Sequence, residues 1–312
     1  MVRQDQGLAF RLKWVEFSIQ APPEFVEPLS QIFHRYGQGG VAVETAGGFN
    51  PDEGEKPPED ALVTLSTYIP HDERLDGRRA QIQVGVLLVG HVAPISELRE
   101  RVLDEQDWQE AWKRHFHVLR VGQRVVIVPT WREYQPSGFQ VMVRLDPGMA
   151  FGTGHHPTTR MCLEELESLV QPGMAVLDMG CGSGILSIAA AKLGAMRVTG
   201  IEIEPTAVGV AAENVRLNGV EGIVEVYQGS LPHPAVPRAS CGLVCANISA
   251  KVIGDLAGDL AAAAQPGAAI LASGILKERS EEVSLRLLEV GVQVERTRAD
   301  GDWVVLVARA AR

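Results

Sequence analysis

Residues 176–184 read VLDMGCGSG and give the strongest indication of the fold in this chain. An apolar strand ends at Asp178, a turn containing Gly180, Gly182 and Gly184 follows, and a helix rich in alanine and isoleucine continues the chain. Glycine permits backbone angles that other residues avoid and lets a ligand approach the main chain closely. In open α/β sheets, ligands lie at such carboxyl ends of strands. The stretch therefore predicts a ligand site; a turn that merely closes a strand–helix corner is the alternative.

Strands and helices alternate around this stretch. Strands are expected at residues 174–179, 197–203, 222–228, 242–247, 267–273, 292–298 and 302–309. Helices are expected at residues 157–170, 184–194, 205–217, 249–265 and 277–290. Such alternation predicts an α/β domain with a parallel, doubly wound sheet over residues 146–312.

Residues 1–95 have the pattern of a smaller α+β domain. Strands are expected at 12–19, 41–44 and 61–68, helices after Pro23 and at 72–85, and a polar loop at 46–60. This order favours a ferredoxin-like layer. Between the two domains, residues 96–145 predict a linker, made of a charged helix over 96–117 and a pair of strands at 123–129 and 138–145.

The glycine spacing and two acids decide between classes of nucleotide ligand. The turn has no lysine for a phosphate-binding loop, and Ile185 stands where a dinucleotide fingerprint needs a third small residue. Asp178 would repel a pyrophosphate but suits a cationic ligand. Glu202, at the end of the next strand, can accept hydrogen bonds from both ribose hydroxyls. A nucleoside with a cationic amino-acid end and no phosphates fits both acids, and S-adenosylmethionine is such a molecule.

Asn247 ends the strand expected at 242–247, where the fourth strand of such a sheet meets a methyl-transfer site. Its amide can donate to and accept from an amine without carrying charge, so it is a candidate for positioning the amine. A simple turn cap is the alternative. Enzymes that methylate base amines place Pro-Pro-aromatic after this position, whereas residues 248–250 are Ile-Ser-Ala, which disfavours a nucleobase target.

The loop at residues 145–159, LDPGMAFGTGHHPTT, precedes the first helix of the large domain. Its glycines and prolines suit a lid over a ligand, and Thr158 or Thr159 offers a hydroxyl at the helix start. His155 and His156 are adjacent, but no third ligand follows at metal spacing, so no metal is expected. Cys241 and Cys245 are interpreted as small core residues rather than a zinc clip.

Composition bounds the class of protein. The chain has 312 residues, 46% of them hydrophobic, and a net charge of −10, which predicts a two-domain globular protein without a basic surface for nucleic acid. No apolar run approaches the ~20 residues of a membrane helix, and residues 1–14 lack a signal-peptide pattern. Four scattered cysteines make no disulfide framework. A cytoplasmic protein, monomeric and without direct nucleic-acid binding, is expected.

Five runs, LDPGMAFGTGHHPTT, VLDMGCGSGILSIAAAKLGA, GIEIEP, CANISA and LASGIL, closely resemble the PrmA family, the methyltransferases of ribosomal protein L11. The resemblance implies a seven-stranded fold dependent on S-adenosylmethionine, joined by a linker helix to an N-terminal domain that grips the ribosomal protein. It implies methylation of lysine side-chain and N-terminal amines of that protein. Carried over by position, the family's cofactor contacts fall on Thr159, Gly180, Glu202 and Asn247.

The chain departs from the family pattern at three places. His155 stands where the family usually has threonine, and Ser249 where it has leucine. Glu202 replaces an aspartate but keeps the carboxylate, so cofactor binding is not in doubt. His155 and Ser249 bear on the fit of the substrate.

Other functions stay open from the sequence alone. A methyltransferase of the same fold acting on another protein, a small-molecule amine or a nucleic acid is one alternative. A nicotinamide oxidoreductase is disfavoured by the glycine spacing. A non-catalytic module with a vestigial pocket is disfavoured by the presence of Asp178, Glu202 and Asn247 together.

Overall fold

A computed structural model describes residues 13–22, 25–45, 62–104, 107, 117–145, 154 and 156–311. The chain divides into two compact units, Met1–Phe116 and His117–Arg312. The predicted linker is shared between them, because its first strand belongs to the sheet of one unit and its later strands to the other. The division into three parts at residues 95 and 145 stays a prediction.

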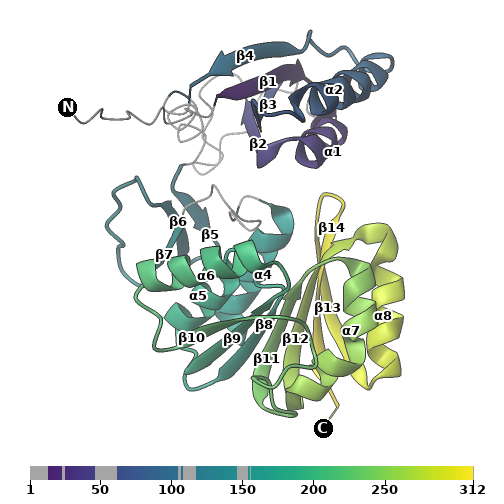
Figure 1. Cartoon of the computed structure of the whole chain (residues 1–312). Coiled ribbons are helices and arrows are strands. Elements are labelled where there is room, and N and C mark those ends of the chain that lie inside the picture. The colour runs from purple at the N-terminus through teal and green to yellow at the C-terminus, as the bar shows by residue number, and fades with distance from the viewer. Residues whose placement is uncertain are drawn as a thin grey trace, which may run out of the picture. The chain divides into compact units, whose positions relative to one another are not determined.

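The first unit is a four-stranded antiparallel sheet with two helices (Figure 1). Its elements are β1 Trp14–Ala21, α1 Val26–Tyr36, β2 Gln38–Thr45, β3 Val63–Pro70, α2 Leu75–Gly90 and β4 Arg99–Leu103. The strands lie in the order β2-β3-β1-β4. Alternate β1 residues Val15, Phe17 and Ile19 are buried in one core with residues of α1 and α2. The predicted ferredoxin-like layer is confirmed, while the loop expected at 46–60 lies outside the described residues.

The helix expected over 96–117 is wrong at Arg99–Leu103, which form strand β4. This strand pairs with β1 from Ser18↔Arg99 to Trp14↔Leu103. Its charged residues favour a helix locally, but the edge of β1 offers unpaired N–H and C=O groups that an extended segment can satisfy. Arg101 also pairs with Glu16 of β1 at 3.1 Å. Most of residues 105–116 lies outside the described part of the chain.

The second unit is built on a seven-stranded sheet with the order β10-β9-β8-β11-β12-β14-β13. Its strands are β8 Ala175–Met179, β9 Arg197–Glu202, β10 Val224–Gln228, β11 Cys241–Asn247, β12 Ala264–Leu276, β13 Val292–Asp300 and β14 Trp303–Ala310. The sheet, predicted to be parallel and doubly wound, departs from parallel pairing at β14, which runs antiparallel to β12 and β13. The turn at Gly301, with φ of 58°, leads β13 straight back as a hairpin, and a hairpin forces antiparallel pairing.

Helices cover both faces of this sheet (Figure 1). They are α4 Pro157–Leu169, α5 Ile185–Leu193, α6 Pro205–Leu217, α7 Ala250–Ala263 and α8 Ser280–Glu289, with a short 3-10 turn at Lys277–Arg279. Successive strand residues point to opposite faces. Accordingly Val176 shares a core with α4 and α5, whereas Leu177 shares the other core with α7 and α8.

A small sheet of β5 Leu119–Val121, β6 Val125–Pro129 and β7 Val141–Leu145 packs against α4 and α5. The predicted strand pair is therefore present, with β6 and β7 running parallel and β5 added antiparallel. Glu167 of α4 accepts three backbone N–H groups from residues 123–125. Asn218, at the end of α6, exchanges two hydrogen bonds with the backbone of Arg144. These bonds anchor both sides of the small sheet to the helices beside it.

Candidate active site

The turn after β8 exposes main chain at the carboxyl edge of the sheet. Gly180, Gly182 and Gly184 have φ of 72°, 54° and 79°, in the left-handed region that glycine adopts without strain. The N–H groups of Gly180 and Cys181 donate to the carbonyl of Ile201 at 2.8 and 3.1 Å, which ties the turn to β9. Gly184 is the N-cap of α5 and has no side chain to cover the helix N-terminus.

Asp178 is a buried carboxylate. The residue is 1% exposed, Oδ2 accepts a 2.6 Å hydrogen bond from Ser187 of α5, and Oδ1 has no hydrogen-bond partner among the residues that the structure describes. Burial raises the pKa of Asp178 to about 6; nearby Glu202 also raises it, while the Ser187 bond lowers it. A buried acceptor without a partner is costly, so Oδ1 marks a place where a donor from a ligand would be stabilising.

Glu202 ends β9, the strand beside β8. Oε2 accepts from the N–H of Gly182 at 2.9 Å, and Oε1 accepts from Ile203 and Glu204 at 2.8 and 3.1 Å. Three backbone donors thus fix the carboxylate against the glycine turn. A carboxylate offers about four lone-pair positions, so acceptor capacity remains for a ligand hydroxyl.

Asn247 and Thr159 meet on the other side of the glycine turn. Asn247 ends β11, which pairs with β8 so that Cys245 lies opposite Asp178. The Nδ2 of Asn247 donates to Oγ1 of Thr159, in the first turn of α4, at 3.4 Å. Thr159 is fully buried and Asn247 is half-buried. The ends of β8, β9 and β11 and the start of α4 therefore bring all the predicted site residues to one sheet edge.

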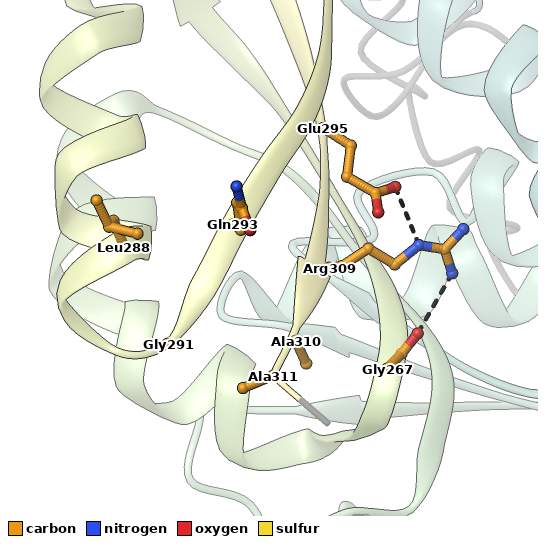
Figure 2. A pocket seen from close by; sticks show the side chains of 8 residues that line it. All are labelled: Gly267, Leu288, Gly291, Gln293, Glu295, Arg309, Ala310 and Ala311. Atoms are coloured by element: carbon orange, nitrogen blue, oxygen red, sulfur yellow. Dashed lines mark hydrogen bonds and ion pairs between the residues drawn. The ribbon is translucent and has the colours of Figure 1, made fainter.

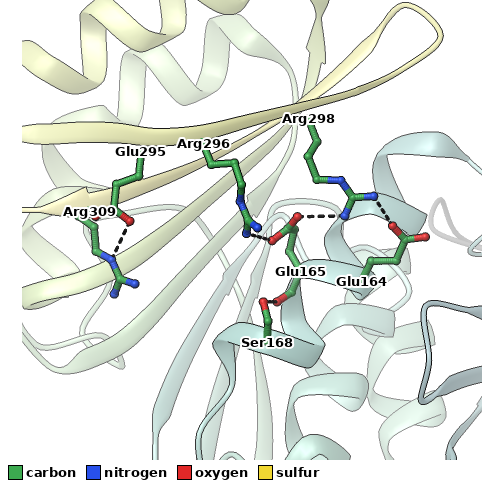
Figure 3. A network of polar contacts seen from close by, with 7 residues as sticks. All are labelled: Glu164, Glu165, Ser168, Glu295, Arg296, Arg298 and Arg309. Atoms are coloured by element: carbon green, nitrogen blue, oxygen red, sulfur yellow. Dashed lines mark hydrogen bonds and ion pairs between the residues drawn. The ribbon is translucent and has the colours of Figure 1, made fainter.

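The α4 helix that carries Thr159 is held by arginines of β13 (Figure 3). Glu165, with a side chain 3% exposed, pairs with Arg296 and, at 3.0 Å, with Arg298. Arg298 also contacts Glu164 at 2.5 Å. Nearer the helix start, Arg160 pairs with Asp300 at 2.7 Å. One edge strand thus fixes α4 along its length.

Several residues of the predicted lid loop lie outside the described part, namely 146–153 and 155. His156 is described: it is the N-cap of α4, with Nδ1 2.7 Å from Oγ1 of Thr158 and its ring edge-on to Trp303, 4.8 Å between centroids. Cys241 and Cys245 are buried in the two apolar cores, as small core residues. Ser249, one of the departures from the family pattern, is the exposed N-cap of α7.

Sequence reasoning missed Ser187 and Ile248. Ser187 is read from the sequence as one small residue among the alanines of α5, and nothing in the sequence says that it faces Asp178. Ile248 lies beside Gly180, because a methyl group built on Gly180 would meet its Cγ2 at 2.2 Å. The glycine itself is the signal that could have been used: a turn glycine indicates that something packs where a side chain would be.

A hollow of ≈ 600 Å³ is lined by residues near the C-terminal end of β14 and the start of β13, away from the glycine turn; Figure 2 shows its lining residues. Arg309 crosses it, bonding to Glu295 at 3.1 Å and to the carbonyl of Gly267 at 3.3 Å. Arg309 and Glu295 there satisfy each other, whereas Oδ1 of Asp178 has no such partner among the described residues. Within the described residues no helix has the length and apolar character of a membrane span.

Comparisons with known proteins agree with this geometry. The model of the family "Ribosomal protein L11 methyltransferase (PrmA)" matches residues 13–311. The chain belongs to this family. A ribosomal protein L11 methyltransferase of Chloroflexus aurantiacus is 45% identical, with 95% of this chain and 98% of that protein covered. One of Herpetosiphon aurantiacus is 39% identical, with 96% and 99% covered.

A solved structure supports the fold. The crystal structure of a ribosomal protein L11 methylase from Lactobacillus delbrueckii subsp. bulgaricus matches with a TM-score of 0.59 and 33% identity, covering 63% of this chain and all of that one. The resemblance drawn from the sequence is confirmed. Membership in the PrmA family also confirms that the chain is a methyltransferase with a seven-stranded α/β domain.

Proposed function

We propose that this chain transfers the methyl group of S-adenosylmethionine to lysine side-chain amines and the N-terminal amine of ribosomal protein L11. The observation that supports the donor is made on Asp178, a buried carboxylate beside the glycine turn whose Oδ1 has no partner within the described part of the chain. The names of the relatives support the acceptor. We further propose a monomeric, cytoplasmic enzyme without a metal and without direct nucleic-acid contact.

The site residues fit a donor that is cationic and lacks phosphates. Two carboxylates, Asp178 and Glu202, flank the turn. Their negative charges would repel a pyrophosphate bound at the turn. When bound, S-adenosylmethionine supplies an electrophilic methyl group on a sulfonium. Asp178 would accept a hydrogen bond from the ammonium end through Oδ1, and Glu202 would accept one from a ribose hydroxyl.

The remaining residues shape the donor site. Gly180, Gly182 and Gly184 let the donor approach the main chain and the N-terminus of α5. Thr159 and Asn247 line the side nearest β11. Since Nδ2 of Asn247 is bonded to Thr159, its Oδ1 is the atom left to accept an N–H of the acceptor amine.

The acceptor amine has to lose a proton before it can attack. A lysine of pKa ~10.4 is neutral in about one molecule in 2,500 at pH 7, a cost of ~4.6 kcal/mol. A dry pocket lowers the pKa of an amine by disfavouring its charged form. Holding nitrogen and methyl in line contributes roughly 7–11 kcal/mol. We assign Asn247 the role of positioning the amine for this in-line attack.

Mass spectrometry tests this function. The enzyme is incubated with purified ribosomal protein L11 and S-adenosylmethionine, and methyl increments are mapped to individual amines. We expect increments on lysine side chains and the N-terminus, strongly reduced with Asn247→Ala and unchanged with Val252→Ala, a change at an exposed residue of α7. Unmodified L11, with methylation of a different protein or of a small amine in the same assay, would show that the acceptor has been assigned wrongly.

A further inference from the structure

Ile248 lies between the glycine turn and the end of β12. A methyl group built on Gly180 would come within 2.2 Å of Ile248 Cγ2, so this branch of the side chain fills the space that a side chain at Gly180 would take. The N–H of Ile248 donates to the carbonyl of Ser273 at 3.1 Å. Ile248 follows Asn247 directly, so the residue that packs on the donor turn is bonded covalently to the residue that we assign to the acceptor.

The backbone of Ile248 is fixed as tightly as its side chain. Gly274, with φ of 81°, follows Ser273 in β12, and a methyl group built on it would lie 2.2 Å from the carbonyl oxygen of Ile248. Asn247 and Ser273 are opposite each other in the pairing of β11 with β12. Two glycines, Gly180 in the turn after β8 and Gly274 in β12, thus leave room for Ile248, which packs between them.

We propose that Ile248 is a positioning residue for methyl transfer: contact of its Cγ2 with Gly180 sets the separation between the donor turn and Asn247. The inference rests on the proposed function, because it assumes a donor at the turn and an amine at Asn247. Its physical basis is that the rate of methyl transfer depends steeply on the alignment of the reacting atoms: a misplacement of 1 Å lowers the rate about 100-fold. A close-packed contact transmits such a displacement because it is not compressible.

The contact is made by Cγ2, so side chains with and without a branch at Cβ distinguish a positioning role from simple filling of volume. Valine keeps the branch at Cβ and both γ carbons, whereas leucine keeps the full volume of isoleucine but has no branch at Cβ. A volume-filling role predicts that leucine is tolerated at least as well as valine. The positioning role predicts instead that valine at residue 248 preserves kcat better than leucine does.

We therefore compare Ile248→Val, Ile248→Leu and Ile248→Ala in the full chain. We expect kcat for L11 methylation within twofold of wild type for valine, and about 10- to 100-fold lower for leucine and alanine. The Kd for S-adenosylmethionine, from calorimetry, should stay within about threefold. Ile253→Val, a matched change at a fully buried α7 residue of the same core, should lower Tm and leave kcat unchanged. Wild-type kcat in the leucine variant, or a change in Kd alone, would overturn the proposal.

A second readout needs no acceptor. The amide resonance of Gly274, recorded with and without S-adenosylhomocysteine, reports whether occupancy of the turn reaches β12 through Ile248. A shift in wild type and the valine variant, and none in the leucine variant, is expected; equal shifts in all three would contradict the proposal. If L11 proves not to be the acceptor, this experiment still decides the role of Ile248.

Discussion

The Nδ2 of Asn247 donates to Oγ1 of Thr159 across 3.4 Å, joining the end of β11 to the first turn of α4. This bond leaves one face of the Asn247 amide for a ligand and fixes its direction. Since α4 is held in turn by β13, the orientation of Asn247 depends on the central strand β11 and on the edge strand β13.

Thr159→Val removes the oxygen that accepts from Asn247 while keeping the shape of a fully buried side chain. One neutral hydrogen bond is worth about 1 kcal/mol, so kcat is expected to fall about fivefold. Steady-state kinetics at saturating S-adenosylmethionine measures it. Thr199→Val, a buried threonine of β9, is the control and should leave kcat unchanged. Equal kcat in wild type and Thr159→Val would show that the bond does not orient the amide.

Cofactor binding is expected to tighten as pH rises through about 6, the pKa to which burial raises Asp178. Below that pH the carboxyl is protonated and cannot pair with the ammonium of S-adenosylmethionine. The association constant should then fall about tenfold per pH unit. Calorimetry between pH 5 and 8 tests this expectation. Asp178→Asn should bind more weakly and with a flat pH profile, and a flat profile in wild type would exclude ionised Asp178 as the ammonium partner.

The same carboxyl sets a pH dependence of stability. Its folded pKa of about 6 lies above the ~3.9 of free aspartate, so the folded chain binds this proton more tightly than the unfolded chain does. The contribution of Asp178 to the free energy of unfolding therefore falls as pH rises from about 4 to 6 and stays low above. Asp178→Asn should raise Tm at pH 7 and have less effect at pH 4, as a thermal melt at each pH would show. A lower Tm at pH 7 in this variant would contradict the sign.

Glu202→Gln exchanges one of two acceptor oxygens for a donor. The three N–H groups of Gly182, Ile203 and Glu204 then compete for one oxygen, and at least one stays unpaired. An unpaired buried donor costs about 1–3 kcal/mol, so Tm should fall and Kd for S-adenosylmethionine should rise at least tenfold. Glu202→Asp keeps the carboxylate, so its Tm should fall less and its Kd for S-adenosylmethionine should rise less than in the glutamine variant. A glutamine variant that binds as well as the aspartate variant would contradict the hydrogen-bonding role.

Glu165→Gln removes the charge that faces Arg296 and Arg298 (Figure 3). The glutamate is buried while both arginines are partly exposed, so a loss of about 1–2 kcal/mol in the free energy of unfolding is expected, less than for a fully buried pair. Urea denaturation measures it. Arg309→Gln breaks a pair with Glu295 in which both side chains are over 40% exposed, and should cost under about 1 kcal/mol. Equal losses in the two variants would contradict the clamping role of Glu165.

The alternating strands and helices of residues 157–309 could be predicted from local sequence patterns, as could the positions of Asp178, Glu202 and Asn247 at strand ends. Periodicity, glycine and proline act over a few residues, so these features can be predicted locally. Because parallel strands share a carboxyl edge, the three side chains had to meet there once the strands were adjacent. Pro157 and Pro205 at the first turns of α4 and α6 are further signals that need no tertiary contact.

Four features depend on contacts between distant parts of the chain. Two concern strands: Arg99–Leu103 pairs with β1, and β14 runs antiparallel to β12. The other two are side-chain contacts: Ser187 donates to Asp178, and Ile248 packs against Gly180. Each of these features depends on a partner that lies nearby in the fold but, in most cases, tens of residues away in the sequence. A charged segment that favours a helix alone becomes a strand where an edge needs partners, and a small residue gains a role from the group that it faces. Local preference is a property of the segment, while these outcomes are properties of the assembled core.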